Sequence, residues 1–335
     1  MSTPRQNFLA ALHHEETEIT PYGIGFLEEP AERMDRLRPG WRDEIVQYKA
    51  GWALRFPREQ VEPDSDFYRD EFGCIWQKGT IWHIHEVPLK EPSLDGYAWP
   101  DVTRPERYDG LDEIAVNHPD KFRAGYTGLA FFEKYWQLRG WEGLYDFAAD
   151  GAFAESLLDK LLELQLQVVD RLGKAEVDCI GFSDDQSDQR GVTIGAPRWR
   201  QMLKPRFKTL FDRVRSYGKL TFLHCCGNVM EIVPDLIEIG LDYLNPLQPE
   251  CMDVFELKRQ YGKDLLLEGG IGTQRLLPFG APEQIHEAVR KCRLELGKDG
   301  GYILALTKAV RPETPDENML AVFDAVVHQP PRSEL

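Results

Sequence analysis

The chain has 335 residues, of which 42% are hydrophobic and 29% are charged, and its formal net charge is −16 at pH 7. This balance is typical of a globular protein. It argues against a nucleic-acid binder, which needs a basic face, and against docking on an anionic membrane. No run of about 18 apolar residues is present, so no membrane-spanning helix is predicted. Six cysteines without the spacing of a disulfide framework, and an N-terminal segment without an apolar core, predict a cytoplasmic protein.

In the first half of the chain, the sequence predicts a few separate helices and strands and no regular alternation of the two. Residues 4–14 fit a short amphipathic helix, and residues 19–26 fit a first strand. Residues 50–101 are rich in Pro, Asp, Gly and Trp and contain short alternating segments, which predicts hairpins inserted into the N-terminal part of the fold. Residues 154–172 carry apolar side chains at helical spacing and predict a long helix.

The second half alternates regularly between short apolar runs and amphipathic segments. The predicted strands are residues 177–182, 220–223, 243–244, 265–267 and 302–306, and the predicted helices are residues 197–217, 229–239, 254–261, 281–296 and 315–327. Strands that alternate with helices imply a parallel sheet. So many units in succession favour a closed (β/α)8 TIM barrel, with residues 1–335 as one domain.

Polar groups follow the predicted strands at the points where the strands end. They lie in residues 183–186, 224–228, 245–249, 268–270 and 306–308. The carboxyl ends of barrel strands meet at one rim, where barrel enzymes carry their reactive groups. Five such strand ends together predict a functional cleft at that rim.

Two of these residues are suited to binding a metal ion. His224 and Cys226 are two residues apart, and imidazole and thiolate are both good zinc ligands. A catalytic zinc site needs a third protein ligand, for which Glu268, Cys251 and Asp184 are candidates by residue type. The alternative is that His224 and Cys226 are packed polar residues without a metal.

Acidic residues and a lysine complete the candidate site. Asp184 and Asp185 are adjacent, so in an extended segment only one of them points into the cleft, as a general base, a substrate contact or a partner of His224. Capping of a helix or loop is the structural alternative. Glu268 precedes two glycines that allow close approach. Lys308 either binds an anionic group or is a solvated residue of the rim.

Several motifs are absent from the sequence. It contains no G-x-S-x-G elbow, no phosphate-binding G-x-x-x-x-G-K-[ST] loop and no G-x-G-x-x-G after a strand, so no nucleotide cofactor is implied. It also lacks a D-x-H-x-x-G segment of the kind that supplies a lower histidine ligand to cobalamin. Any corrinoid is therefore expected to arrive on another protein.

The order and spacing of several segments carry a family resemblance. They are residues 4–6 with 10–12, 184–191, 204–206, 223–229, 245–249, 269–274 and 301–315. Together they resemble the uroporphyrinogen decarboxylase superfamily, which includes the zinc- and corrinoid-dependent methyltransferases. The resemblance spans nearly the whole chain, is weak in residues 50–101, and implies a (β/α)8 barrel.

The resemblance is closer to the methyltransferase branch. True uroporphyrinogen decarboxylases have an arginine-rich N-terminal segment for the substrate's carboxylates, whereas residues 22–30 here hold two acids and no arginine. The methyltransferase branch holds zinc with an H-x-C pair and a later cysteine. His224 and Cys226 match the pair, but Lys308 stands where the later cysteine would fall, and Glu268 is the first candidate to complete the site.

These observations lead to one leading hypothesis. It is a corrinoid-dependent methyltransferase subunit that moves a methyl group between a small, for example methoxylated, substrate and cobalamin on a partner corrinoid protein, with zinc as a further cofactor and a homo-oligomer as an option. The predicted catalytic residues are Asp184, His224 and Glu268, the substrate-binding residues are Asp185, Gln189, Gln248 and Lys308, and the metal ligands are His224, Cys226 and Glu268.

Two alternatives stay open at this point. The first is a decarboxylase or other lyase that acts on a small carboxylic acid, with Lys308 or Arg190 as the anion anchor. The second is a barrel that binds a corrinoid protein or a small ligand without turnover, which the missing third cysteine suggests.

Overall fold

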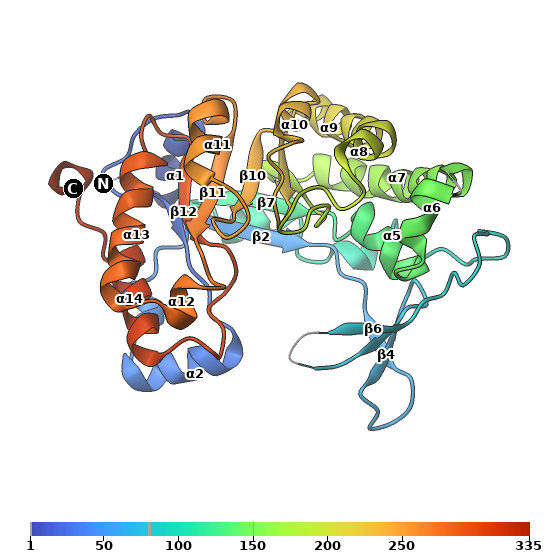
Figure 1. The fold of residues 1–335 in the computed structure, drawn as a ribbon, viewed down its shortest axis with the longest axis horizontal. Helices are drawn as coiled ribbons and strands as arrows, with labels where there is room; N and C mark the ends of the chain where they lie inside the picture. Colours follow the sequence, from blue (N-terminus) through green and yellow to red (C-terminus); the bar gives the residue numbers. More distant parts are fainter. Residues whose placement is uncertain (1, 80–81, 150) are drawn as a thin grey trace.

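Eight parallel strands form one curved sheet in the computed structural model, which describes residues 2–79, 82–149 and 151–335 (Figure 1). Their order is β1-β12-β11-β10-β9-β8-β7-β2. The strands are β1 (Tyr22–Gly23), β2 (Lys49–Ala53), β7 (Phe122–Tyr126), β8 (Cys179–Ser183), β9 (Leu220–His224), β10 (Tyr243–Leu247), β11 (Leu266–Ile271) and β12 (Tyr302–Leu306). From β2 through β7 to β12, each strand lies beside the next strand of this sheet along the chain, and β1 lies beside β12. This is the strand order of a (β/α)8 barrel, so the predicted fold class is confirmed.

The barrel differs from the expected closed one at a single seam. No ladder joins β1 to β2 among the residues that the structure describes, and these two strands are the ends of the sheet. β1 has only two residues, where the sequence predicted a strand over residues 19–26. So short a strand pairs with β12 at Tyr22 and Gly23 and offers little edge for a second partner.

Helices follow the strands and cover the outside of the sheet (Figure 1). They are α1 (Pro4–Leu12), α2 (Glu28–Leu37), α3 (Trp41–Glu44), α4 (Ile114–Asn117), α5 (Phe132–Arg139), α6 (Gly143–Ala149), α7 (Gly151–Gly173), α8 (Ala196–Met202), α9 (Lys204–Ser216), α10 (Val233–Glu238), α11 (Val254–Tyr261), α12 (Leu276–Phe279), α13 (Pro282–Glu295) and α14 (Asp316–Val327), with 3-10 turns η1 (Pro105–Tyr108) and η2 (Arg332–Glu334).

The hydrophobic core lies between the sheet and these helices. All six residues of β11 are buried, as expected for a parallel strand that is covered on both faces. The apolar stripe of α7 is fully buried at Leu157, Leu161 and Val168, at the helical spacing that predicted it. Packing of such faces, rather than helix propensity, supplies most of the stability of these helices.

One predicted helix is divided in two. The sequence predicted a helix over residues 197–217, but α8 ends at Met202 and α9 begins at Lys204. Pro205 explains the break. Proline has no backbone N–H to donate to the preceding turn, and its ring disfavours the helical conformation of the residue before it.

A second, antiparallel sheet is inserted between β2 and β7. Its strands are β3 (Arg58–Gln60), β4 (Phe67–Asp70), β5 (Ile75–Gln77) and β6 (His83–Glu86), in that order. It projects from the barrel next to α5 (Figure 1), and hydrogen bonds from Cys74 Sγ to the Gln137 carbonyl (3.3 Å) and from the Leu89 N–H to the Leu138 carbonyl (3.1 Å) fasten this region to that helix. The predicted range 50–101 started too early, because its first residues belong to barrel strand β2.

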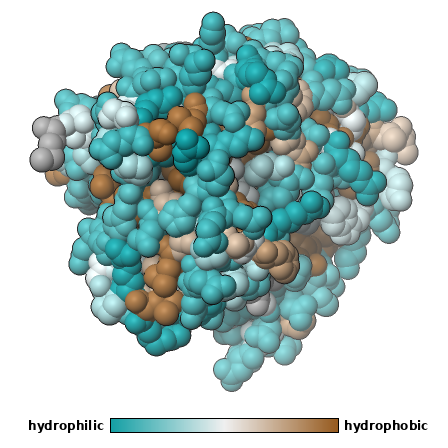
Figure 2. All heavy atoms as spheres, turned by 60° about the vertical axis from the view of Figure 1, so that its left-hand side comes forward, coloured by the Kyte–Doolittle hydropathy of each residue, from teal (hydrophilic) through white to brown (hydrophobic). Residues whose placement is uncertain are grey.

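One face of the surface is mainly hydrophilic. Figure 2 shows a face covered mainly by hydrophilic side chains, with hydrophobic ones in small, separate groups. Among the described residues, no helix has both the length and the apolar composition that crossing a membrane requires.

Candidate active site

The carboxyl ends of β8, β9 and β10 lie side by side. In the sheet register, His224 at the end of β9 is opposite Ser183 on one side and Asn245 on the other. Backbone hydrogen bonds continue one residue further, from the Asp184 N–H to the His224 carbonyl (2.9 Å) and from the Cys225 N–H to the Asn245 carbonyl (2.8 Å). The loops that follow β8 and β9 therefore begin at the same level of the sheet, beside Asn245 of β10.

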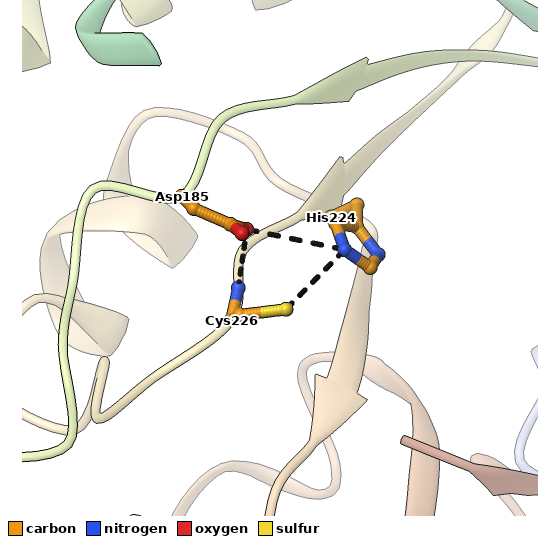
Figure 3. A group of neighbouring side chains, drawn as sticks. All are labelled: Asp185, His224 and Cys226. Atoms are coloured by element: carbon orange, nitrogen blue, oxygen red, sulfur yellow. Dashed lines mark hydrogen bonds and ion pairs between the residues drawn. The ribbon is translucent and has the colours of Figure 1, made fainter. Parts of the chain in front are cut away.

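Asp185, His224 and Cys226 form a compact group at these strand ends (Figure 3). One potential ligand atom of each lies within 4.8 Å of the others. His224 Nε2 is 3.4 Å from Cys226 Sγ and 3.9 Å from Asp185 Oδ1. The backbone N–H of Cys226 donates to the same Asp185 oxygen at 2.8 Å. The loop after β8 and the loop after β9 thus contribute to one site.

Asn245 fixes the orientation of the His224 ring. Its side-chain oxygen lies 2.6 Å from His224 Nδ1, and because an amide oxygen only accepts, Nδ1 carries the proton. The neutral tautomer then leaves a lone pair on Nε2, which faces Cys226. Burial, together with the nearby Lys308 cation, lowers the pKa of His224 and favours this neutral form.

Two charged residues stand beside the group. Lys308 Nζ lies 3.4 Å from His224 Nε2. Burial lowers the pKa of Lys308, but Cys226 and Asp185 outweigh that effect, so the pKa of the ammonium is raised overall. Burial, and then the negative charge of Asp185, raise the pKa of Glu133 to about 7. Burial and Asp185 also raise the pKa of the Cys226 thiol to about 12.

Gly227 lets the loop after β9 pack against the loop after β8. Its φ is +92°, and a Cβ atom there would lie 2.5 Å from the Ser187 carbonyl oxygen, so no other residue fits. The Gly227 N–H donates to the side-chain oxygen of buried Gln248 at 3.1 Å, and the Asn228 N–H donates to the Asp188 carbonyl at 2.7 Å. These contacts hold Cys226 in its place next to Asp185.

Asp184 points away from this group, to the start of α5. Its fully buried carboxylate accepts the backbone N–H groups of Phe131 (3.2 Å), Phe132 (3.0 Å) and Glu133 (2.8 Å). Burial raises the pKa of Asp184 to about 8, while the three N–H donors stabilise the charged form and oppose that shift. The structure therefore places Asp184 as a cap of the start of α5, which is the structural alternative that the sequence left open.

Glu268 also lies outside the group. Its carboxylate forms an ion pair with Lys49 Nζ (2.6 and 2.7 Å) and accepts from the Tyr243 hydroxyl. Lys49 and Tyr243 are the first residues of β2 and β10, so the carboxylate is directed back along the sheet. The structure thus brings Asp185, and neither Glu268 nor Cys251, next to His224 and Cys226 as a third potential ligand.

Of the remaining predicted site residues, some lie at the site and one lies away from it. Gln248 and Lys308 contact the site, whereas Gln189 is exposed and bonds to Gln274 at 3.0 Å. Glu133 and Lys49 were not predicted as site residues. Glu133 lies in a helical segment rich in aromatic residues, and Lys49 lies in a strand without alternation of polar and apolar residues. Neither pattern marks a functional residue, so the two were identified only by the residues that surround them in the structure.

The three ligand atoms fit a zinc ion by type and by spacing. Catalytic zinc takes three protein ligands from His, Cys and carboxylate side chains and keeps one position open. Bond lengths of about 2.0 Å to nitrogen and about 2.3 Å to sulfur place tetrahedral ligand atoms roughly 3.5 Å apart. The separations of 3.4 and 3.9 Å from His224 Nε2 are close to that value.

Comparison with known proteins gives consistent results. The chain is 26% identical over 241 residues to the methylated-thiol–coenzyme M methyltransferase of Methanosarcina mazei, covering 69% of this chain and 62% of the relative. It is 29% identical over 171 residues to the methylcobamide:CoM methyltransferase MtaA of Methanosarcina barkeri, covering 51% of this chain and 48% of the relative. The chain thus spans between 48% and 62% of the length of these curated relatives.

A solved structure and a family match complete the comparison. A methyltransferase from Methanosarcina mazei superimposes with a TM-score of 0.69 at 20% identity, covering 98% of this chain and 99% of that one, which supports the fold. Residues 144–329, more than half of the chain, match the family described as uroporphyrinogen decarboxylase (URO-D). The chain therefore belongs to the uroporphyrinogen decarboxylase family.

Proposed function

We propose that this protein is a corrinoid-dependent methyltransferase subunit. It moves a methyl group between a small substrate, with methoxylated compounds as the first candidates, and cobalamin carried by a separate corrinoid protein. The observation that carries the proposal is the group of Asp185, His224 and Cys226, whose ligand atoms lie within 4.8 Å of one another at the carboxyl ends of barrel strands. The methyltransferase names of both curated relatives support the same reaction class.

Asp185, His224 and Cys226 would hold a zinc ion in this proposal. A bound zinc ion would act there as a Lewis acid and stabilise negative charge on the oxygen, nitrogen or sulfur atom bearing the methyl group. Asn245 keeps Nε2 of His224 unprotonated and correctly oriented. Asp185 ties its own loop to Cys226 through the backbone N–H. Asp184 positions the start of α5, and with it Glu133, beside the group.

The charge balance of methyl transfer suits such a site. In the direction toward cobalamin, the bond from the methyl carbon to the donor atom breaks and its electron pair stays on that atom. The electron pair for the new bond to the methyl carbon would come from the reduced corrinoid on the partner protein. The negative charge on the leaving atom must be compensated, which a zinc ion held by Asp185, His224 and Cys226 would do.

The test uses the purified protein with a reduced corrinoid protein and a panel of methyl ethers, methylamines and methyl thioethers. We expect at least one donor to produce the absorbance change of methyl-cobalt formation, and the His224→Ala variant to abolish it. A complementary assay starts from methylated corrinoid and offers free thiols as acceptors. Absence of transfer in both directions, with release of carbon dioxide from a small carboxylic acid without corrinoid, would favour the lyase instead.

A further inference from the structure

Lys308 is the feature that does not fit a simple metal site. Its Nζ atom is 3.4 Å from His224 Nε2, and Cys226 Sγ is at the same distance from that nitrogen. Asp185 Oδ1 lies 3.9 Å from the same nitrogen. A cation is thus already present among the groups that would bind a metal cation.

His224 can serve only one partner at this nitrogen. A neutral imidazole with its proton on Nδ1 has a single lone pair on Nε2, and the contact with Asn245 assigns the proton to Nδ1. An ammonium N–H and a metal ion therefore compete for the same electron pair. They also repel each other, since both are positive and the surroundings are partly buried.

The backbone at Lys308 is fixed, but its side chain is free to leave. The Thr307 N–H donates to the Ile271 carbonyl at 3.0 Å, and the buried Thr307 hydroxyl lies 3.0 Å from that of Thr273. Lys308 itself is exposed, and a lysine has a flexible four-carbon stem. Its ammonium can thus move into solvent without rearrangement of β12 or the loop after it.

We propose that Lys308 occupies the place of the metal ion in the metal-free protein, so that its contact with His224 and zinc binding exclude each other. This inference rests on the zinc site of the proposed function. Lys308 is then a positioning residue. It keeps Asp185 and Cys226 together without a metal and lowers the affinity for zinc.

The test is a zinc titration of metal-free protein in competition with a chromophoric chelator. We expect Lys308→Met, which keeps the length of the side chain and removes its charge, to bind zinc about tenfold more tightly or better. Lys308→Arg keeps the charge and should stay near the wild-type affinity. Lys263→Met, an exposed lysine away from the site, is the matched control and should not change it.

An affinity of Lys308→Met equal to or below that of the wild type would overturn the inference. Absence of zinc binding in every variant would overturn it together with the zinc in the proposed function. Methyl transfer is measured separately. A protein that transfers methyl groups and binds zinc, but is indifferent to Lys308→Met, therefore refutes this inference alone.

A second measurement decides the matter if Lys308→Met does not fold. The wild-type protein is treated with an amine-acetylating reagent with and without zinc, and acetylation of Lys308 is followed by mass spectrometry. Zinc should increase the rate at Lys308 and leave the rate at Lys263 unchanged. An unchanged or decreased rate at Lys308 would mean that zinc does not release this side chain.

Discussion

Asp184 and Asp185 are neighbours in the chain, but their carboxylates bind different parts of the protein. Asp184 accepts three backbone N–H groups at the start of α5, and Asp185 accepts the backbone N–H of Cys226 and faces His224. One residue of extended chain reverses the direction of the side chain, which is why two adjacent acids serve a helix and a site. Their substitutions should therefore have different consequences.

Asp184→Ala should mainly lower stability. The substitution leaves three buried N–H groups at Phe131, Phe132 and Glu133 without their acceptor, and we expect the free energy of unfolding to fall by about 2–4 kcal/mol. Urea denaturation followed by circular dichroism measures this change. Asp185→Ala is the matched control, and its half-exposed side chain should cost less than about 1 kcal/mol. Similar losses in the two variants would contradict the division of roles.

The sequence was sufficient to predict the barrel but not the full composition of the site. Strand and helix periods repeat regularly after Val177, and β12 and α11 have the predicted bounds. The strand β2 was missed because Lys49–Ala53 contains no β-branched residue and lies on the edge of the sheet. Residue type identified His224 and Cys226 as candidate metal ligands.

The third candidate ligand could not be chosen from residue type. Asp184, Cys251 and Glu268 were all acceptable donors, and the choice depends on side-chain directions that the sequence does not encode locally. The carboxylate of Glu268 binds Lys49 instead. Lys49 is far away in the sequence and lies in β2, a strand that is not adjacent to β11 in the sheet. Asp185 is brought to the pair by the packing of two loops at Gly227.

Zinc content distinguishes the two possible third ligands. We expect the wild-type protein to bind about one zinc ion per chain, and Asp185→Ala, His224→Ala and Cys226→Ser to lose most of it. Glu268→Gln should retain it, because Glu268 is bound to Lys49 and Tyr243 instead. Metal analysis after gel filtration in buffer with trace zinc provides the measurement. Retention in Asp185→Ala and loss in Glu268→Gln would restore Glu268 as the ligand.

Asn245 should affect the metal site without binding the metal. Removing its side chain in Asn245→Ala releases His224 Nδ1 and lets the ring rotate or change tautomer, and such partners typically contribute 10–100-fold, so we expect a loss of about that size in zinc affinity. Asn245→Asp keeps an acceptor at the same place and should bind zinc more tightly than the alanine variant. Equal affinities of the alanine variant and the wild type would show that the ring is oriented in another way.

The pair of Lys49 and Glu268 should be coupled in stability. The side chain of Glu268 is 6% exposed and that of Lys49 is 24% exposed, so removal of one charge leaves the other poorly solvated. We expect Lys49→Met alone to lower the free energy of unfolding by about 3–5 kcal/mol. Glu268→Gln alone should also destabilise, because the Lys49 ammonium and the Tyr243 hydroxyl then lose a charged acceptor.

The double variant Lys49→Met with Glu268→Gln separates this coupling from simple packing loss. With both charges removed, neither residue is left as an unpaired ion, so the double variant should be more stable than the sum of the two single losses predicts, by about 1–3 kcal/mol. Urea denaturation of the four proteins gives the cycle. Strict additivity would mean that water reaches both groups well enough to replace the ion pair.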